Sequence, residues 1–519
     1  MQLGGAGGAG GALGGAGGLA GGAGVGGQGG LAGGAGVGGG TGGSSGSGGL
    51  GGQGGSGGGV PPTITPGAAD RILLQGAVLA PTGPLMGEVL VEGNLITCVA
   101  ASCSAQSGAA GATVIQTNGV IMPGMLDSHN HGLFNIFDED DWNAGKLFKN
   151  HNQWNPTSEP RYGAVVDAKQ YMESVSSGAN VSCELAKWAE TKAIIAGTTS
   201  FLLAGGATVR KCYGTSARTI DTDQNGLPTD NVRTSISIPS VGAATSACNA
   251  IKAGTTTSYV VHIAEGLDET SRKEWDTFES RENGCLITKE TAITHGTALT
   301  AVEFGKMAAA GMKLIWSPKS NDYLYGDVTN IPLAMSSGVT TIALAPDWAL
   351  GGGLNMLEEL RFADNWDNTK FGDVLSPERL FKMVTIDAAK ALAVDQWLGS
   401  LEVGKRADVT VISGGIAAPY DDLLKAKPQT VRLVMVDGRV AYGDKVLQAA
   451  GPAAPGCEAM TVCGADKFIC LAENDTNDKK NQTLAQVQTI LETELTKYDN
   501  TQSPVGGPLS PLAPLFKCN

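Results

Sequence analysis

Short apolar runs alternate with amphipathic stretches through the middle of this chain. Such alternation is typical of βα units around a parallel sheet. Helices are predicted at Ala301–Ala310, Met356–Asn365 and Glu378–Thr385, the last preceded by an N-cap Ser376 and a Pro at the first helical position. Eight strands are predicted: Val120–Asp127, Thr198–Leu203, Arg218–Asp221, Val232–Pro239, Ser258–Ile263, Ala292–Thr294, Met312–Trp316 and Thr340–Ala345. The region approaches the ~250 residues of a (β/α)₈ TIM barrel, an α/β fold, which is therefore the predicted fold class.

Strand-like patterns of a second kind flank this region on both sides. Apolar and polar residues alternate, with Gly at turns, in Ala69–Ala100, Ala407–Ser413 and Val431–Gly443. The pair Asp437-Gly438 between two apolar runs is a hairpin signal. We therefore expect a small composite β-sandwich domain built from both ends of the chain. The predicted boundaries are 61–119 and 395–450 for this domain and 120–394 for the barrel.

The two ends of the chain differ in composition from the rest. Residues 1–60 are mostly Gly with Ala, Ser, Leu, Val and Gln, and such a segment cannot bury enough surface to offset its chain entropy. We predict a flexible, disordered tether there; it lacks the charged start and apolar core of a signal peptide. Residues 451–519 are predicted as a cysteine-containing tail with one amphipathic helix, Thr483–Lys497, and a Pro-rich end.

Charge and hydropathy indicate which kinds of molecule this protein does not bind. The formal net charge is −14 and the pI is about 4.9, which argues against nucleic acid and anionic membrane surfaces. No apolar run reaches the roughly 18 residues of a membrane span, so no transmembrane segment is predicted. A small-molecule substrate is the expected partner, and a homo-oligomer remains open.

Ten cysteines are spread along the chain, and none forms a C-x-x-C pair. Their spacing is unlike that of zinc knuckles or redox motifs. Cys98 and Cys103 could close a short loop, and four more cysteines crowd the tail. Several disulfides are predicted, and with the tether they favour an extracytoplasmic or cell-surface location. Buried free thiols and a cytoplasmic location are the alternative.

Side chains that bind metals follow several of the predicted strands. His129 and His131 form an H-x-H after the first strand, where alternate side chains point the same way. The ends of the fifth, sixth and eighth strands carry His262, Glu265, His295 and Asp347. In a parallel barrel these positions meet at the C-terminal face, where such barrels do their chemistry.

These motifs together resemble those of the amidohydrolase superfamily. P-G-M-L-D-S-H-N-H is similar to its first-strand motif, and T-H-G-T-A-L to its sixth-strand motif. H-I-A-E at 262–265 resembles the H-x-x-E of the deaminase and chlorohydrolase branch. L-G-S-L-E-V-G-K-R-A-D-V-T-V-I is similar to the return into the family's β-domain. The resemblance covers roughly Ala69 to Gly443.

The resemblance implies a metal-dependent hydrolase that cleaves a non-peptide carbon–nitrogen bond, by deamination or by amide or ring hydrolysis. It implies one divalent metal ion, Zn²⁺ first and Fe²⁺ as the alternative. Glu265 would carry a proton to the leaving nitrogen, and His295 would orient the water or stabilise an oxyanion. Asp347 would bind the metal and accept a proton from the attacking water. The implied metal ligands are His129, His131, His262 and Asp347.

Several positions depart from the family pattern or stay open. Binuclear members carry a carboxylated lysine on the fourth strand, and N-V-R-T-S-I-S-I-P-S has none, which favours one metal. Trp348 stands where many members have Gly, and is either a pocket wall or barrel packing. Ser317, Lys319 and Asn321 either line the site or cap and stabilise the next helix. His151, in a polar loop, is expected to be exposed or near the substrate and not a ligand.

Two other functions remain as alternatives. A binuclear metallopeptidase acting on small peptides would need a second metal and the bridging lysine. A non-catalytic surface binding protein would keep the barrel without its chemistry, although the metal and proton-transfer residues are all present.

Overall fold

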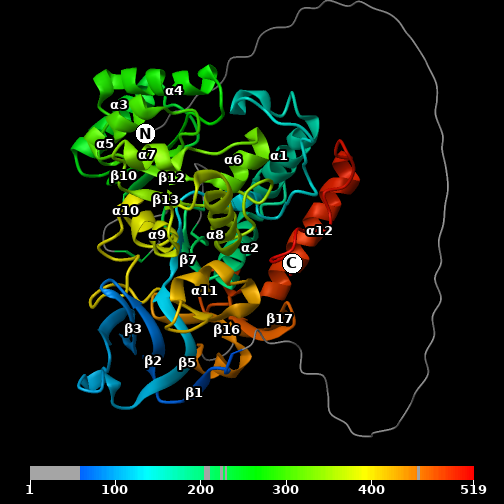
Figure 1. Cartoon of the computed structure of the whole chain (residues 1–519). Helices are drawn as coiled ribbons and strands as arrows, with labels where there is room; N and C mark the ends of the chain where they lie inside the picture. Colours follow the sequence, from blue (N-terminus) through cyan, green and yellow to red (C-terminus); the bar gives the residue numbers. More distant parts are fainter. Residues whose placement is uncertain (1–58, 204–210, 222–225, 228–230, 453–455, 519) are drawn as a thin grey trace, which may run out of the picture. The chain divides into compact units, whose positions relative to one another are not determined.

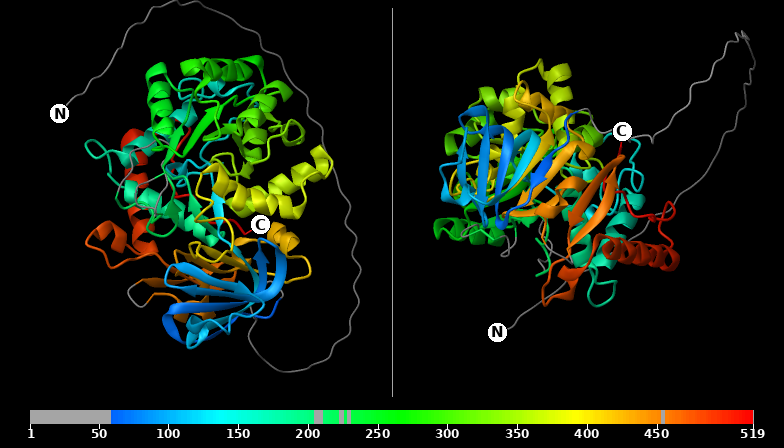
Figure 2. Two further views of the ribbon diagram at one scale, coloured as in Figure 1. Left: turned by 90° about the vertical axis from the view of Figure 1, so that its left-hand side faces the viewer. Right: turned by 90° about the horizontal axis from the view of Figure 1, so that it is seen from below.

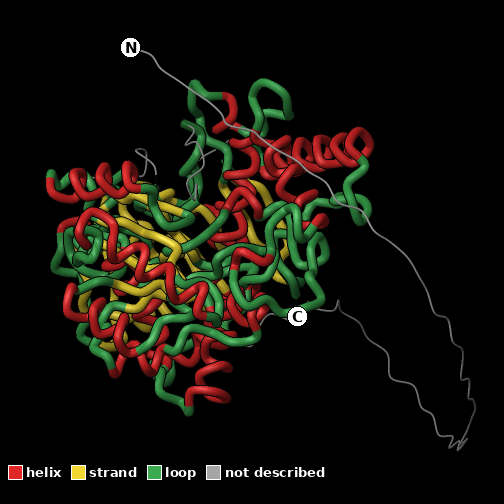
Figure 3. The backbone as a smooth tube through the Cα atoms, turned by 90° about the horizontal axis from the view of Figure 1, so that it is seen from above, coloured by secondary structure: helices red, strands yellow, loops and turns green. Residues whose placement is uncertain are grey.

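The computed structural model of this chain describes residues 59–203, 211–221, 226–227, 231–452 and 456–518. The predicted tether of residues 1–60 lies almost entirely outside these ranges. Strands occupy the middle of the described part, with helices around them (Figure 3). No helix in these ranges combines the length and apolar character that crossing a bilayer requires.

Two parallel sheets form the centre of the fold. One has the order β6-β7-β8 and the other β13-β12-β11-β10-β9, and all their pairings are parallel. A parallel bridge between Asn130 and Asp347 joins the ends of β6 and β13. Each predicted strand of this region overlaps one of these strands, and β11 extends one residue beyond its prediction at both ends. They are β6 (Met125–Asp127), β7 (Thr198–Phe201), β8 (Arg218–Thr219), β9 (Val232–Ser235), β10 (Ser258–Ile263), β11 (Thr291–His295), β12 (Lys313–Trp316) and β13 (Ile342–Leu344).

The first predicted strand is divided between two sheets. Its start belongs to β5 (Ala112–Pro123) and its end to β6, with Gly124 between them. Pro123 has no N–H to continue a ladder, and a Cβ on Gly124 would collide with the side chain of Thr199. The close approach allowed by glycine lets the chain turn from one sheet directly into the next.

Helices follow most of the parallel strands and cover the sheets (Figure 1). The predicted helix at Ala301–Ala310 is α5, which starts at a capping box of Thr300 and Glu303 and ends at Gly311 with φ of 68°. The predicted N-cap Ser376 accepts a hydrogen bond from the amide of Arg379. The helices here are α1 (Pro160–Glu173), α2 (Ser182–Ile195), α3 (Val241–Lys252), α4 (Glu269–Ser280), α5, α6 (Pro318–Tyr325), α7 (Ile331–Ser336), α8 (Met356–Trp366), α9 (Pro377–Met383) and α10 (Ile386–Ala391).

A ten-stranded mixed sheet combines segments from both ends of the chain (Figure 2). Its order is β17-β18-β16-β15-β14-β5-β2-β3-β4, with β1 also on β5. β14 pairs with β5 with Val411 opposite Ile121, which joins the two segments. The predicted hairpin turn is present, with positive φ at Asp437 and Gly438. The remaining strands are β1 (Thr63–Thr65), β2 (Ala68–Ala80), β3 (Gly83–Glu92), β4 (Leu95–Ala100), β14 (Val409–Ser413), β15 (Val431–Val436) and β16 (Arg439–Asp444), and helix α11 is Pro419–Lys425.

The tail contains more structure than the single helix that the sequence predicts. β17 (Cys457–Val462) and β18 (Ala465–Cys470) form a hairpin that extends the mixed sheet. Its signal is the Cys463-Gly464 turn, with positive φ at both residues, between alternating apolar positions. The predicted helix is α12 (Leu484–Gln502), capped by Thr483 and packed against α1 and α2.

All ten cysteines are paired, as the prediction of several disulfides requires. The pair Cys98–Cys103 closes the short loop after β4, as expected. Two pairs fasten the tail, one across the β17–β18 hairpin and one to the end of the chain. The five pairs are Cys98–Cys103, Cys183–Cys212, Cys248–Cys285, Cys457–Cys470 and Cys463–Cys518.

A buried ion pair ties the parallel sheets to the mixed sheet. Arg218 of β8 donates to both carboxylate oxygens of Asp408, at 2.8 and 3.3 Å, and both side chains are buried. Asp408 directly precedes β14, and its carboxylate also accepts from the amide of Asp437. Arg218 also donates to Asp437 at 3.3 Å, so breaking the buried pair at Asp408 leaves the buried guanidinium with a partly exposed partner.

We therefore expect Asp408→Asn to lower the free energy of unfolding by roughly 3 kcal/mol. The matched control is Asp70→Asn, an exposed carboxylate beside Arg71, whose loss should cost less than about 1 kcal/mol. Urea denaturation of both variants measures the difference. Equal stability of the two variants would contradict a structural role for the buried pair.

Candidate active site

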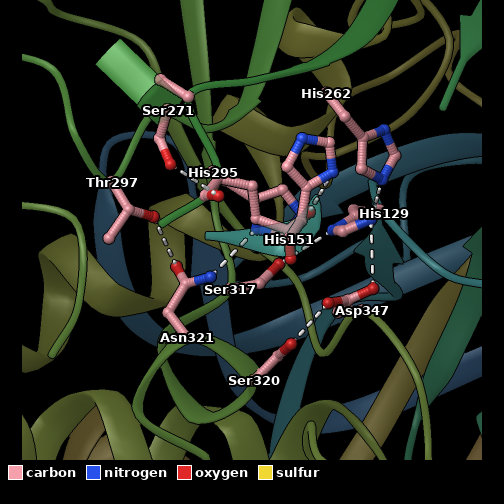
Figure 4. Close-up of polar contacts among 12 residues, drawn as sticks. His129, His151, His262, Ser271, His295, Thr297, Ser317, Ser320, Asn321 and Asp347 are labelled. Atoms are coloured by element: carbon pink, nitrogen blue, oxygen red, sulfur yellow. Dashed lines mark hydrogen bonds and ion pairs between the residues drawn. The ribbon is translucent and has the colours of Figure 1, made fainter. Parts of the chain in front are cut away.

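The predicted metal-binding side chains meet at the carboxyl ends of the parallel strands (Figure 4). His129 and His131 follow β6, His262 lies on β10, His295 ends β11, and Asp347 follows β13. Each of these side chains is buried except for those of His131 and His262, which are partly exposed. The structure therefore brings together side chains that are up to 218 residues apart in sequence (129 to 347).

Ring nitrogens of His131 and His262 and a carboxylate oxygen of Asp347 lie around the ring of His129. Nε2 of His129 lies 2.9 Å from Nε2 of His262 and 3.2 Å from Oδ1 of Asp347. Nε2 of His131 lies 3.4 Å from the same carboxylate oxygen. Two overlapping triads have their donor atoms within 4.8 Å of one another: His129, His131 and His262, and His129, His295 and Asp347.

The Nδ1 atoms of His262 and His129 contact other protein groups, which leaves Nε2 of each ring free to bind a metal. Nδ1 of His262 is 3.2 Å from the carbonyl oxygen of Ser235. A carbonyl only accepts, so in the neutral ring the proton stays on Nδ1 and the lone pair of Nε2 points inward. Nδ1 of His129 contacts the hydroxyl of Ser317 at 2.9 Å. The residues present thus fit a divalent cation that binds imidazole and carboxylate.

The backbone around these ligands is held in unusual conformations. Asp347 and His295 have φ of 71° and 67°, a region that residues other than glycine rarely adopt. Reciprocal bonds hold the β6 and β13 ends together: the amide of Asp347 donates to the carbonyl of His129, and the amide of His131 to that of Asp347. Backbone strain of this kind persists where surrounding contacts hold it and is frequent at functional sites.

Two buried aspartates at the strand ends have pKa values above the usual value of the carboxyl group. Burial, followed by the charge of Glu265, holds the pKa of Asp347 well above its usual value, while Ser320 donates to its Oδ2 at 2.5 Å. Burial raises the pKa of Asp127 to about 7. Asp127 accepts from the amide of His129 and from the side chain of Asn130, so it orients the H-x-H segment.

Burial lowers the pKa of all four clustered histidines, and the neighbouring rings add to the effect. The pKa falls to about 3 for His131 and to about 4 for His262. It falls well below the ordinary value for His129 and His295. The rings are therefore neutral near pH 7, which is the form that binds a metal.

Glu265 lies beside this cluster and is anchored through one oxygen. The hydroxyl of Tyr325 donates to its Oε1 at 2.7 Å and accepts from Nε1 of Trp154 at 2.9 Å. The other oxygen, Oε2, lies 3.7 Å from Nε2 of His295. Because the side chain of Asn321 donates to Nδ1 of His295, the proton of this neutral ring is on Nε2, toward Glu265.

Helix α6 supplies contacts that sequence reasoning found only in part. Ser317 contacts His129 and Asn321 contacts His295, as one of the two predicted alternatives states. Lys319 does not: its ammonium pairs with Glu139 and Glu358. Two further residues near the site, Ser320 and Tyr325, are not predicted from the sequence. Their signal is the spacing of three and four residues from Ser317 and Asn321, which places them on the same helix face.

Trp348 combines the two roles considered for it. It is buried, and its ring centroid lies 6.3 Å from that of His131. It also contacts a group of aromatic rings from the segment after β6. The ring partners of Trp348 within that segment are Phe134, Trp142, Trp154 and Tyr162. Flat apolar walls therefore adjoin the cluster on the His131 side.

This chain resembles known proteins in sequence and in fold. The model of the Amidohydrolase family matches residues 120–441. An S-triazine hydrolase of Gordonia rubripertincta is 26% identical over 211 residues, 39% of this chain and 44% of that protein. A 5-methylthioadenosine/S-adenosylhomocysteine deaminase of Thermoanaerobacter pseudethanolicus is 32% identical over 139 residues, 26% of this chain and 32% of that protein. The matches thus span less than half the length of these relatives.

The solved structures show the same fold at low identity. A zinc complex of an atrazine chlorohydrolase from Arthrobacter aurescens superposes with a TM-score of 0.56 at 16% identity, and covers 74% of this chain and 97% of that one. Together with the family match, this likeness shows a TIM-barrel-like α/β fold.

The lowered pKa values predict the protonation of the histidines without metal. At pH 6 a free histidine, with a pKa near 6.5, is mostly protonated. In metal-free protein His131 and His262 should stay neutral there, since their pKa values are about 3 and about 4. With only five histidines in the chain, NMR of ring-labelled histidine can follow each one. Titration of either ring near pH 6.5 would show that the cluster is open to water.

Proposed function

This chain belongs to the amidohydrolase family, and from that membership we propose that it is a metal-dependent hydrolase. It cleaves a non-peptide carbon–nitrogen bond, by deamination or by amide or ring hydrolysis, through an activated water. The observation that carries the proposal is the convergence of His129, His131, His262 and Asp347 beside Glu265 and His295. That set combines a cation site with groups able to transfer protons, as a hydrolytic site needs.

The proposed metal is one divalent ion, Zn²⁺ first and Fe²⁺ as the alternative. His129, His131, His262 and Asp347 would hold it, with their neutral rings and carboxylate suited to either ion. When bound, the ion would supply the Lewis acidity that makes water a nucleophile near pH 7. Support for a single ion comes from β9, the fourth parallel strand, whose sequence Val-Arg-Thr-Ser lacks lysine. The relatives that carry zinc in their structures support the choice of ion.

Three side chains would move or hold protons during the reaction. Asp347, whose Oδ2 accepts from the hydroxyl of Ser320, would accept a proton from the attacking water. Glu265 would deliver a proton to the leaving nitrogen, with Tyr325 fixing the orientation of its carboxyl group. His295 presents its Nε2 proton beside Glu265 and would donate a hydrogen bond to the developing oxyanion.

The substrate we propose is a small nitrogen-containing ring. The relatives named above act, by their names, on s-triazines and on a thioadenosine. The partly exposed ring of Trp154, which packs against Trp142 and Trp348, offers a flat surface on which such a ring could stack.

We also propose the finer architecture and the location. The eight parallel strands would close into one barrel, supported by the Asn130–Asp347 bridge between its two sheets. Most strands of the mixed sheet would belong to the composite β-sandwich domain predicted from residues 61–119 and 395–450, supported by the β5–β14 pairing. An extracytoplasmic or cell-surface location is supported by the five disulfides.

The proposal predicts about one zinc or iron per chain, and turnover that depends on it. Elemental analysis measures the metal, and ammonia release from 5′-methylthioadenosine and from an amino-s-triazine measures turnover. Chelation should abolish turnover, and added Zn²⁺ should restore it. His129→Ala with His131→Ala should remove the metal. Full turnover by metal-free protein would contradict the proposal, and two metals would favour the binuclear metallopeptidase.

If Glu265 transfers a proton during turnover, its replacement should lower kcat. Glu265→Gln keeps the shape and the Tyr325 contact but cannot carry a proton, so kcat should fall by about 10²- to 10⁴-fold. Its metal content should match that of the unmodified protein. The exposed Glu269→Gln serves as the matched control and should keep normal turnover. A kcat unchanged by Glu265→Gln would remove this residue from the chemistry.

A further inference from the structure

His151 is fixed against the segment that carries Glu265, although 114 residues separate them (151 to 265). Its amide donates to the carbonyl oxygen of Glu265 at 3.2 Å. Asn150 forms an antiparallel bridge with Gly266, and the amide of Leu267 donates to the carbonyl of Lys149. A Cβ on Gly266 would meet the backbone of Lys149 and Asn150, so glycine permits this close approach. The loop after β6 is thereby held in one register on the end of β10.

The ring of His151 lies between two carboxylates. Its Nε2 is 2.5 Å from Oε1 of Glu274 on α4. Its Nδ1 is 4.0 Å from Oε2 of Glu265, a gap that one bridging water can span. Glu274 is itself positioned, because its Oε2 accepts from the amide of Ala264 at 2.9 Å. The order of the three side chains is therefore Glu274, His151, Glu265.

The same oxygen of Glu265 faces both His151 and the reacting centre. Oε1 is occupied by the hydroxyl of Tyr325, whereas Oε2 lies near His295 on one side and His151 on the other. The side chain of His151 is 26% exposed, against 7% for that of Glu265. His151 thus stands between solvent and the oxygen that would carry the proton.

The charged and titratable groups around the ring come from three elements. They are Glu274 of α4, Glu265 and His262 of the β10 segment, and His295 of β11. Burial by itself would lower the pKa of His151, but the hydrogen bond and charge of Glu274 and the charge of Glu265 raise it above its usual value. His151 is thus the one histidine near the cluster whose ring favours the protonated form.

We propose that His151 is a positioning residue that exchanges protons between solvent and Oε2 of Glu265, with Glu274 holding the ring. This inference rests on the proposed function of the same site. Deamination near pH 7 converts an amine, a water and one proton into a hydroxyl product and ammonium. The attacking water supplies the oxygen and two protons; the additional proton passes from Nδ1 of His151 to Glu265, and the imidazole regains it from solvent.

The direct test uses His151→Ala in metal-loaded protein, with the substrate that the unmodified protein turns over. We expect kcat to fall about tenfold or more while KM and metal content stay within about twofold. Imidazole added to the buffer should restore kcat of this variant in a saturable manner, because the vacated position is open to solvent. It should not restore Glu265→Gln. Glu274→Gln should lower kcat and shift the pH profile, whereas the exposed Glu269→Gln on the same helix should do neither.

Unchanged kcat in His151→Ala, or a loss of kcat that imidazole does not restore, would overturn the inference. Loss of metal from His151→Ala would also overturn it, since the residue would then be structural. NMR of the ring-labelled histidines tests the coupling independently of turnover. Glu265→Gln and Glu274→Gln should each lower the pKa of His151, and the absence of a shift with Glu265→Gln would overturn the proposed contact.

If the unmodified protein shows neither metal nor turnover, the proposed function fails and the role of His151 fails with it. If the unmodified protein is active and only the His151 results fail, the proposed function stands without this relay. The two failures are therefore distinguishable.

Discussion

Four neutral imidazoles and two carboxylates crowd together at the ends of the parallel strands, and most of them are buried. The rest of the site depends on this crowding. Burying polar groups is unfavourable unless each has a partner. Here Nε2 of His129 lies 2.9 Å from Nε2 of His262 and 3.2 Å from Oδ1 of Asp347. A divalent cation held by these groups would replace their mutual repulsion with attraction to a shared positive charge. Much of the surrounding structure holds the donor atoms at those positions.

The scaffold meets this constraint through the ends of its strands. The Asn130–Asp347 bridge joins β6 to β13 at the height of the ligands, so the strands that carry the ligands are linked by backbone bonds. Helix α6 places Ser317, Ser320 and Asn321 against His129, Asp347 and His295 respectively. One short segment, α6 with its N-cap Ser317, thus contacts three of the clustered side chains. The Arg218–Asp408 pair then fixes the parallel strands to the mixed sheet.

The residues that converge at the candidate site could be predicted from local sequence patterns. In H-x-H, the alternation of side chains along a strand points both histidines the same way. Histidine and glutamate are seldom buried without a specific partner, so H-x-H and H-x-x-E at strand ends indicate a functional site. Ser320 and Tyr325 were not predicted, since serine and tyrosine occur in many environments and only the folded structure shows what they touch. The division of Val120–Asp127 at Gly124 was missed for a similar reason. The break depends on the close approach of Thr199, which lies 75 residues further along (124 to 199).

These side chains are proposed to bind a single divalent ion. Diffraction is the measurement that locates such an ion most directly. Crystals of the protein with zinc, measured on both sides of the zinc absorption edge, would give an anomalous difference map. The account predicts one peak bounded by ring nitrogens of His129, His131 and His262 and a carboxylate oxygen of Asp347. An empty map at that point, or a zinc peak only elsewhere, would contradict it.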